Sequence, residues 1–171
     1  MHNEGKAQKG THDGTRLVRL MNYCARQERS LLQVRDWMHR HGIEEHEARE
    51  WEQQLVRQGY VNEERFAALY ARSKMRQKKW GWVKIRIGLQ RHGLPDYQIE
   101  AALSALGVEE PLETLHKLAA TKWTKLSAYS GAERRLRLIR YLIGRGYTAE
   151  QSRAEAEGLD RNEGEWADAD E

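Results

Sequence analysis

The side chains in this sequence that are best suited to chemistry are seven histidines, one cysteine and several close carboxylates. His39, His41 and His46 lie near enough to one another to suggest a metal site. However, the chain has no HExxH motif, and a single Cys24 cannot form a CxxC pair, so the usual zinc patterns are missing. We expect neither a metal nor a cofactor.

The position of His41 has another explanation. His41, His92 and Arg145 each precede a glycine in similar stretches of sequence. A place that accepts either His or Arg near the end of a helix is explained by attraction of a cation to the helix C-terminus. The pattern at these three positions therefore favours a structural role for His41, His92 and Arg145.

Catalytic patterns are also weak. The segment EEHEAREWE (Glu44–Glu52) pairs carboxylates, but on a helix it forms a solvated acidic face beside the apolar stripe of Ala48, Trp51 and Leu55. Cys24 lies on an apolar stripe, which indicates a core position. Nothing resembles a nucleophile, base and orienting group at a recognisable spacing. We predict no catalytic residues and a protein that is not an enzyme; an enzyme built on a helical scaffold is the least favoured alternative.

Basic residues give the clearest functional signal. From Arg65 to Pro95 there are nine Lys and Arg and no Asp or Glu, and RQKKWGWVKIRIGLQRHGL lies inside this window. A solvated helix face usually mixes both signs, so two acid-free clusters favour an anionic partner. We predict partner or DNA contacts for Arg72, Lys74, Arg76, Lys78, Lys79, Lys84, Arg86 and Arg91 in the first cluster, and for Arg134, Arg135, Arg137, Arg140 and Arg145 in the second.

Two tryptophans flank Gly81 within the first cluster. We expect Trp82 to pack inward with Ile85 and Leu89, and Trp80 to be the binding residue, either stacking on a base or anchoring a protein contact. We also expect Lys84 and Arg86 to face solvent. No helix-turn-helix recognition pattern accompanies them, so sequence-specific reading of the major groove is not indicated.

These residues require helices to position them. In 171 residues there are two prolines, few β-branched residues, and many Leu, Ala, Arg, Glu and Gln, which is a helical composition. Ser30 with Gln33 and Thr148 with Gln151 form capping boxes, and Asn62 is a good N-cap. Glycines at 42, 59, 93, 107 and 146 stand where helices should end.

The same glycines reveal an internal repeat. VRDWMHRHGI (Val34–Ile43), IRIGLQRHGL (Ile85–Leu94) and LIRYLIGRGY (Leu138–Tyr147) align without gaps. Each is followed by another helical segment, so each repeat is a three-helix unit of about 50 residues. We predict an all-α fold: an elongated tandem array of three three-helix repeats, with about nine short helices.

The predicted organisation has five parts. Residues 1–14 are expected to be disordered, and residues 160–171 form an acidic tail with a net charge of −5. The other 159 residues carry 28 Lys and Arg against 20 Asp and Glu, a net charge of +8. The repeats are assigned to 15–59, 60–107 and 108–159. Because no apolar run approaches the ~18 residues of a membrane span and one cysteine fits a reducing compartment, we expect a cytoplasmic protein.

The second repeat resembles a known family. GYVNEERFAALYARSKMRQKKWGWVKIRIGLQRHGL (Gly59–Leu94) is similar to the signature of the RecX family, regulators of the RecA recombinase. The matching positions are Gly59, Tyr60, Asn62, Arg65, Phe66, Ala67, Arg72, Gly81, Ile85, Arg86, Leu89 and Gly93. Glu63 stands where that family usually has Asp, and the stretch from Trp123 to Ser130 is more divergent.

This resemblance implies a protein that binds in the helical groove of RecA filaments on single-stranded DNA. We expect it to be a monomer. The resemblance further implies that the protein mainly inhibits RecA's ATP hydrolysis, strand exchange and co-protease activity, in recombination and the SOS response. The alternative is a general DNA-binding protein, on single-stranded and possibly double-stranded DNA, without a RecA target. The two differ in salt response, since a bare DNA binder loses affinity steeply as salt rises.

Overall fold

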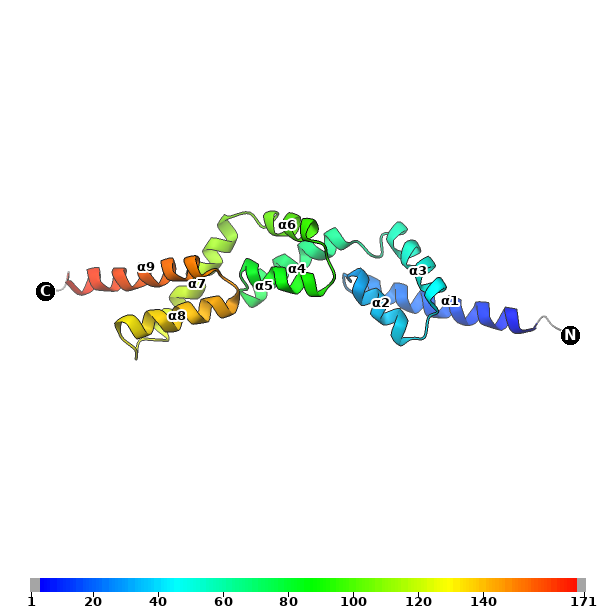
Figure 1. Ribbon diagram of the computed structural model, residues 1–171, viewed down its shortest axis with the longest axis horizontal. Helices are drawn as coiled ribbons and strands as arrows, with labels where there is room; N and C mark the ends of the chain where they lie inside the picture. The colour runs from blue at the N-terminus through cyan, green and yellow to red at the C-terminus, as the bar shows by residue number, and fades with distance from the viewer. Residues whose placement is uncertain (1–3, 169–171) are drawn as a thin grey trace.

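The computed structural model describes residues 4–168, and within that range the chain forms nine α-helices and no strand. The helices follow one another along an elongated molecule whose two ends lie far apart (Figure 1). They pack into three successive groups, each around its own hydrophobic cluster. The predicted all-α array of three three-helix repeats is therefore confirmed.

The first group, which we call module 1, contains α1 (Glu4–Ala25), α2 (Leu31–Arg40) and α3 (Glu45–Arg57). Its core is built from the apolar stripe of each helix, because residues three and four apart share one face. The buried members are Leu20, Cys24, Val34, Trp37, Met38, Ile43, Trp51, Leu55 and Val61.

Module 2 contains α4 (Glu63–Lys78), α5 (Trp82–Arg91) and α6 (Asp96–Ser104). Small residues on α4, Ala67 and Ala71, are fully buried and allow α5 and α6 to approach closely. The larger buried side chains are Phe66, Met75, Ile85, Leu89, Leu94, Ile99, Leu103 and Leu106.

Module 3 contains α7 (Glu109–Thr124), α8 (Gly131–Arg145) and α9 (Ala149–Asp168). Its buried residues are Leu115, Ala119, Trp123, Leu126, Leu138, Leu142, Tyr147 and Ala156. Two cation–aromatic contacts brace the α7–α8 connection: the Arg134 guanidinium lies 4.0 Å from the Trp123 ring centre, and that of Arg137 lies 3.8 Å from the Tyr129 ring centre.

The repeat seen in the sequence corresponds to the middle helix of each module. Val34, Ile85 and Leu138 occupy equivalent places and are all fully buried. The next repeat positions, Met38, Leu89 and Leu142, are buried in the same three clusters. All five glycines predicted to end helices have positive φ, at 42, 59, 93, 107 and 146.

The predicted helix caps are present. Ser30 and Gln33 exchange both hydrogen bonds of a capping box, and Thr148 and Gln151 do the same at the start of α9. The Asn62 side chain accepts a hydrogen bond from the Arg65 amide at 2.8 Å. Each bond satisfies an amide that the first helical turn leaves without a partner.

The two ends of the chain differ from expectation. We expected residues 1–14 to be disordered, whereas α1 begins at Glu4; residues 1–3 lie outside the described range. Likewise, α9 continues to Asp168, well into the predicted acidic tail. Adding residues to an existing helix avoids the cost of nucleation, so the packed parts of α1 and α9 extend into polar sequence.

Candidate functional site

Several cations in the two predicted clusters have carboxylate partners within the protein. Arg76 Nε lies 2.5 Å from Glu110 Oε1, and Arg86 pairs with Glu100. In the second cluster, Arg137 pairs with Glu133 at 2.8 Å and Arg135 pairs with Asp160. Neither cluster is therefore acid-free in space, because α6 and α7 bring carboxylates to the first, and α9 and the first turn of α8 bring them to the second.

A second group of predicted cations contacts backbone carbonyls and aromatic rings. Lys84 donates to the Gly144 carbonyl at 2.9 Å, and Arg145 donates to the Lys78 carbonyl at 2.9 Å. Arg134 donates to the Trp123 carbonyl at 3.1 Å. The Lys74 ammonium lies 5.0 Å from the Tyr70 ring centre. The hydrogen bonds of Lys84, Arg145 and Arg134 link helices and modules, whereas the Lys74 contact lies within α4.

The expectation that Lys84 and Arg86 face solvent is therefore wrong in its simple form. Both are half-buried, and both have internal partners on neighbouring helices. Lys84 lies at the junction with module 3, and its Cβ lies close to the backbone of Gly146.

Five of the predicted cations are exposed and form no ion pair with a carboxylate among residues 14–161, whose side chains the structure describes. They are Arg72, Lys78, Lys79, Arg91 and Arg140. We name these five residues the free cations. They lie on α4, at its C-terminal end, on α5 and on α8, so they span modules 2 and 3. An exposed cation without an ion-pair partner can attract an external anion. A cation that is already paired with a carboxylate attracts such an anion less, because the carboxylate offsets its charge.

The exposure of the two tryptophans is the reverse of what we predicted. Trp80 is half-buried and packs against the module 2 core, with the ammonium groups of Lys74 and Lys84 at 5.4 and 5.1 Å from its ring centre. Trp82 is 41% exposed. Because α5 begins at Trp82 and helical side chains lean toward the N-terminus, this ring overhangs the end of α5 instead of entering its core.

Modules 2 and 3 meet through their backbones. The Gly81 amide donates to the Arg145 carbonyl at 2.9 Å, and the Val83 amide donates to the Gly146 carbonyl at 3.1 Å. A Cβ on Gly81 would lie 2.3 Å from the Gly146 oxygen, which leaves no room for a side chain. We call this contact the Gly81–Gly146 junction. The sequence analysis missed it, because these residues are far apart in the chain and no local pattern links them.

Modules 1 and 2 are joined differently. Arg65 on α4 pairs with Glu28 at 2.6 Å and also donates to the Gly59 carbonyl at 3.0 Å. In the described part of the chain, no backbone hydrogen bond links α1–α3 to α4–α6. This joint therefore depends on side-chain contacts, which include those of Arg65 and the approach of Leu32 to Gly93.

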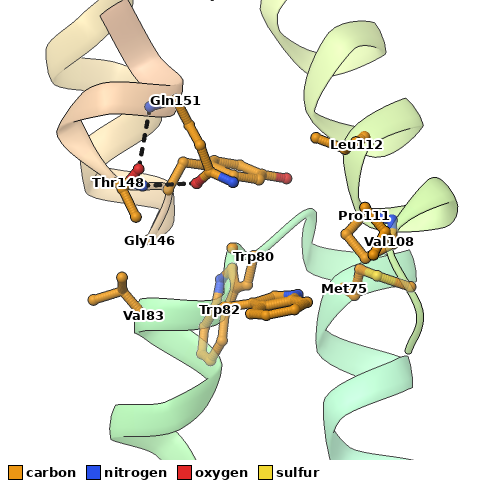
Figure 2. A pocket seen from close by; sticks show the side chains of 12 residues that line it. Met75, Trp80, Trp82, Val83, Val108, Pro111, Leu112, Gly146, Thr148 and Gln151 are labelled. Carbon is orange, nitrogen blue, oxygen red and sulfur yellow. Dashed lines mark hydrogen bonds between the residues drawn. The ribbon is translucent and has the colours of Figure 1, made fainter. Parts of the chain in front are cut away.

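A small cavity lies beside the Gly81–Gly146 junction. It has a volume of about 150 Å³ and an apolar lining that includes Met75, Trp82, Val108, Pro111 and Leu112. Figure 2 shows that the lining comes from three places: α4 with the start of α5, the start of α7, and the turn before α9. Sequence reasoning did not identify Val108 or Leu112, since both look like ordinary helix-end residues.

Two of the histidines, His41 and His92, take structural positions at helix ends. His41 caps α2: its Nδ1 lies 2.7 Å from the Trp37 carbonyl oxygen, and its ring stacks on that of Trp37. His92 caps α5 and contacts the rings of Phe66 and Tyr70; burial, followed by the charge of Lys74, lowers its pKa. Among the described residues, no group of three or more His, Cys, Asp or Glu could hold a metal ion.

Burial also accounts for the state of the single thiol. Cys24 is 4% exposed in the module 1 core, and desolvation raises its pKa to about 11. A thiol that stays protonated at neutral pH is a poor nucleophile. In residues 4–168, no helix is both long and apolar enough to cross a membrane.

Comparison with known proteins agrees with the fold. The model of the second three-helix domain of RecX matches residues 62–103, and that of the third matches residues 109–154, together 88 of 171 residues. Regulatory protein RecX of Halorhodospira halophila is 31% identical over 111 residues, which cover 64% of this chain and 66% of that protein. The Clostridium acetobutylicum protein of the same name is 30% identical over 98 residues, covering 55% of this chain and 45% of that protein.

Two solved structures have the same architecture. The crystal structure of RecX from Lactobacillus salivarius superposes with a TM-score of 0.79 at 21% identity, covering 88% of this chain and 98% of that one. A second regulatory protein RecX superposes with a TM-score of 0.73 at 17% identity, covering 88% and 76%. At these identities the likeness concerns the fold.

Proposed function

Because the chain belongs to the RecX family, we propose that it is a regulatory protein that binds RecA and RecA–single-stranded DNA filaments. In this proposal it lies in the helical groove of the filament as a cytoplasmic monomer. There it mainly inhibits RecA's ATP hydrolysis, strand exchange and co-protease activity, in recombination and the SOS response. It performs no catalysis of its own.

The observation that carries this proposal is the placement of the free cations. Arg72, Lys78, Lys79, Arg91 and Arg140 lie on two modules of an elongated array. Charges spread along a long body can contact several repeating units of an anionic partner at once, which raises the overall affinity without any single strong contact. A filament of protein on DNA offers such repeating units.

The second candidate is a general DNA-binding protein without a RecA target. It is supported by the same cations, since phosphate contacts need only positive charge. Salt separates the two. Binding to naked DNA through about five phosphates should weaken steeply as salt rises, with a log–log slope of roughly −3.5 for single strands. Association that depends on RecA should persist at salt that abolishes naked-DNA binding.

The test is RecA's single-strand-dependent ATP hydrolysis, titrated with this protein from far below one molecule per RecA. Inhibition is expected for the natural sequence and should be weakened by Arg72→Gln with Lys78→Gln. The matched control is Arg35→Gln with Arg49→Gln, which removes the same charge from module 1 residues that pair with Glu52 and Glu45. Absence of inhibition, together with salt-sensitive binding to DNA alone, would establish the second candidate.

A further inference from the structure

The cavity beside the Gly81–Gly146 junction is preformed, and its rim is exposed and apolar. Trp82 is 41% exposed, Leu112 39% and Val108 66%, and all three line the cavity. Isolated apolar residues on a surface need no explanation, but three that surround one concave site mark a contact surface. The two modules hold the site open, because their backbones are bonded beside it.

We propose that this cavity receives one bulky apolar side chain, of phenylalanine or leucine size, from an acidic segment of the protein partner. This inference rests on the proposed function, since it assigns a surface for the protein component of the filament. The size follows from the volume: a cavity of about 150 Å³ matches the engineered protein cavity of that size that binds benzene.

The surrounding charges explain why the segment should be acidic. Glu110 precedes the lining residue Pro111, and three cations act on this single carboxylate. A hydrogen bond from Arg76 is the largest cause of its lowered pKa, and the charges of Arg72 and Lys79 lower the pKa further. On the side of the cavity where α4 meets the start of α7, the cations that act on Glu110 therefore outnumber this carboxylate. Carboxylates beside the inserted side chain would therefore be attracted there.

The lining also argues against a nucleobase. A base carries donors and acceptors on its edges, and burying them without partners costs free energy. The polar side chains at the cavity are Thr148, Gln151 and Tyr147, beside the indole rings of Trp80 and Trp82. The capping box of α9 already occupies the amide and the hydroxyl of Thr148 and the amide and side-chain oxygen of Gln151 (Figure 2). The Tyr147 hydroxyl donates to the Lys79 carbonyl at 3.4 Å. An apolar side chain makes no such demand.

The experiment uses neutral substitutions on the rim. Val108→Gln with Leu112→Gln removes apolar surface without changing the net charge, and Val56→Gln on α3, where Val56 is 47% exposed, is the control. Binding to RecA filaments and to single-stranded DNA alone is measured by anisotropy for each protein. We expect the rim variant to lose about tenfold or more in filament affinity, as for a central contact residue, with unchanged affinity for DNA.

Three other results would overturn the inference. Unchanged filament affinity in the rim variant would show that the cavity is not used, while the proposed function stands. An equal loss for DNA alone would assign the cavity to nucleic acid. No filament binding by the natural sequence would remove the proposed function and this inference together. If the double variant does not keep its helical circular dichroism, Val108→Gln alone, at the most exposed rim position, provides the same comparison.

Discussion

Replacing Gly81 by alanine should separate or distort modules 2 and 3. Gly81 has φ −78° and ψ 168°, a conformation that alanine adopts without strain, so any effect comes from the contact itself. The added Cβ would lie 2.3 Å from the Gly146 oxygen and 2.5 Å from its carbonyl carbon. Both are backbone atoms, which cannot turn away as a flexible side chain can.

The expected loss of stability can be worked out from the contacts that Gly81→Ala would break or strain. If the modules separate, two backbone hydrogen bonds are lost, each contributing about 1 kcal/mol. If they stay together, overpacking costs about 1–3 kcal/mol. We therefore expect the free energy of unfolding to fall by about 2–3 kcal/mol. For a chain of this size that corresponds to a loss of roughly 4–12 °C in Tm.

The measurement is urea unfolding followed by far-ultraviolet circular dichroism, with limited proteolysis to detect separation of module 3. Gly144→Ala is the matched control: it lies within α8 next to the same junction, and its new Cβ would meet nothing within 4 Å. That change should stabilise by about 0.5–1 kcal/mol, because alanine favours a helix. A Gly81→Ala protein within about 0.5 kcal/mol of the natural one would refute the junction.

Three further outcomes are expected. Leu89→Ala, at a fully buried site, should lower the free energy of unfolding by about 2–4 kcal/mol, whereas Leu69→Ala, at a side chain 48% exposed, should change it by less than about 0.5 kcal/mol; similar losses would place Leu89 outside the core. Cys24, with a pKa of about 11, should resist alkylation by iodoacetamide at pH 8 until urea unfolds module 1, and rapid reaction in the native protein would contradict its burial. Arg72→Gln with Lys78→Gln should make the log–log salt slope for single-stranded DNA shallower by about 1.4, and an unchanged slope would show that neither residue contacts phosphate.

Local patterns in the sequence predicted much of this fold. Ser30, Asn62 and Thr148 cap helices as their side chains and spacing indicate, because capping depends only on residues three apart. The repeated Val34, Ile85 and Leu138 are buried because helical periodicity and a shared layout both point to one face. These features depend only on residues within one helix and at its two ends.

The details of the candidate site could not be predicted in the same way. Glu110 neutralises Arg76 although 34 residues separate them, so a window that looks acid-free along the chain acquires a carboxylate on folding. The exposure of Trp80 and Trp82 depends on where α5 begins, which the sequence around Gly81 does not decide. Such outcomes are set by tertiary packing, which one sequence does not display.

The contact between modules 1 and 2 and the contact between modules 2 and 3 differ in rigidity, so they contribute unequally to the entropy lost on binding. Modules 2 and 3 are fixed by hydrogen bonds between backbones, which salt hardly weakens, so their relative position is settled before any partner arrives. Module 1 is attached through the ion pair of Arg65 with Glu28, whose strength falls as ions screen it. When a partner binds all three modules, fixing modules 2 and 3 therefore costs little conformational entropy. Most of the entropy lost on binding comes from fixing module 1. The position of module 1 should therefore respond to salt more than that of module 3.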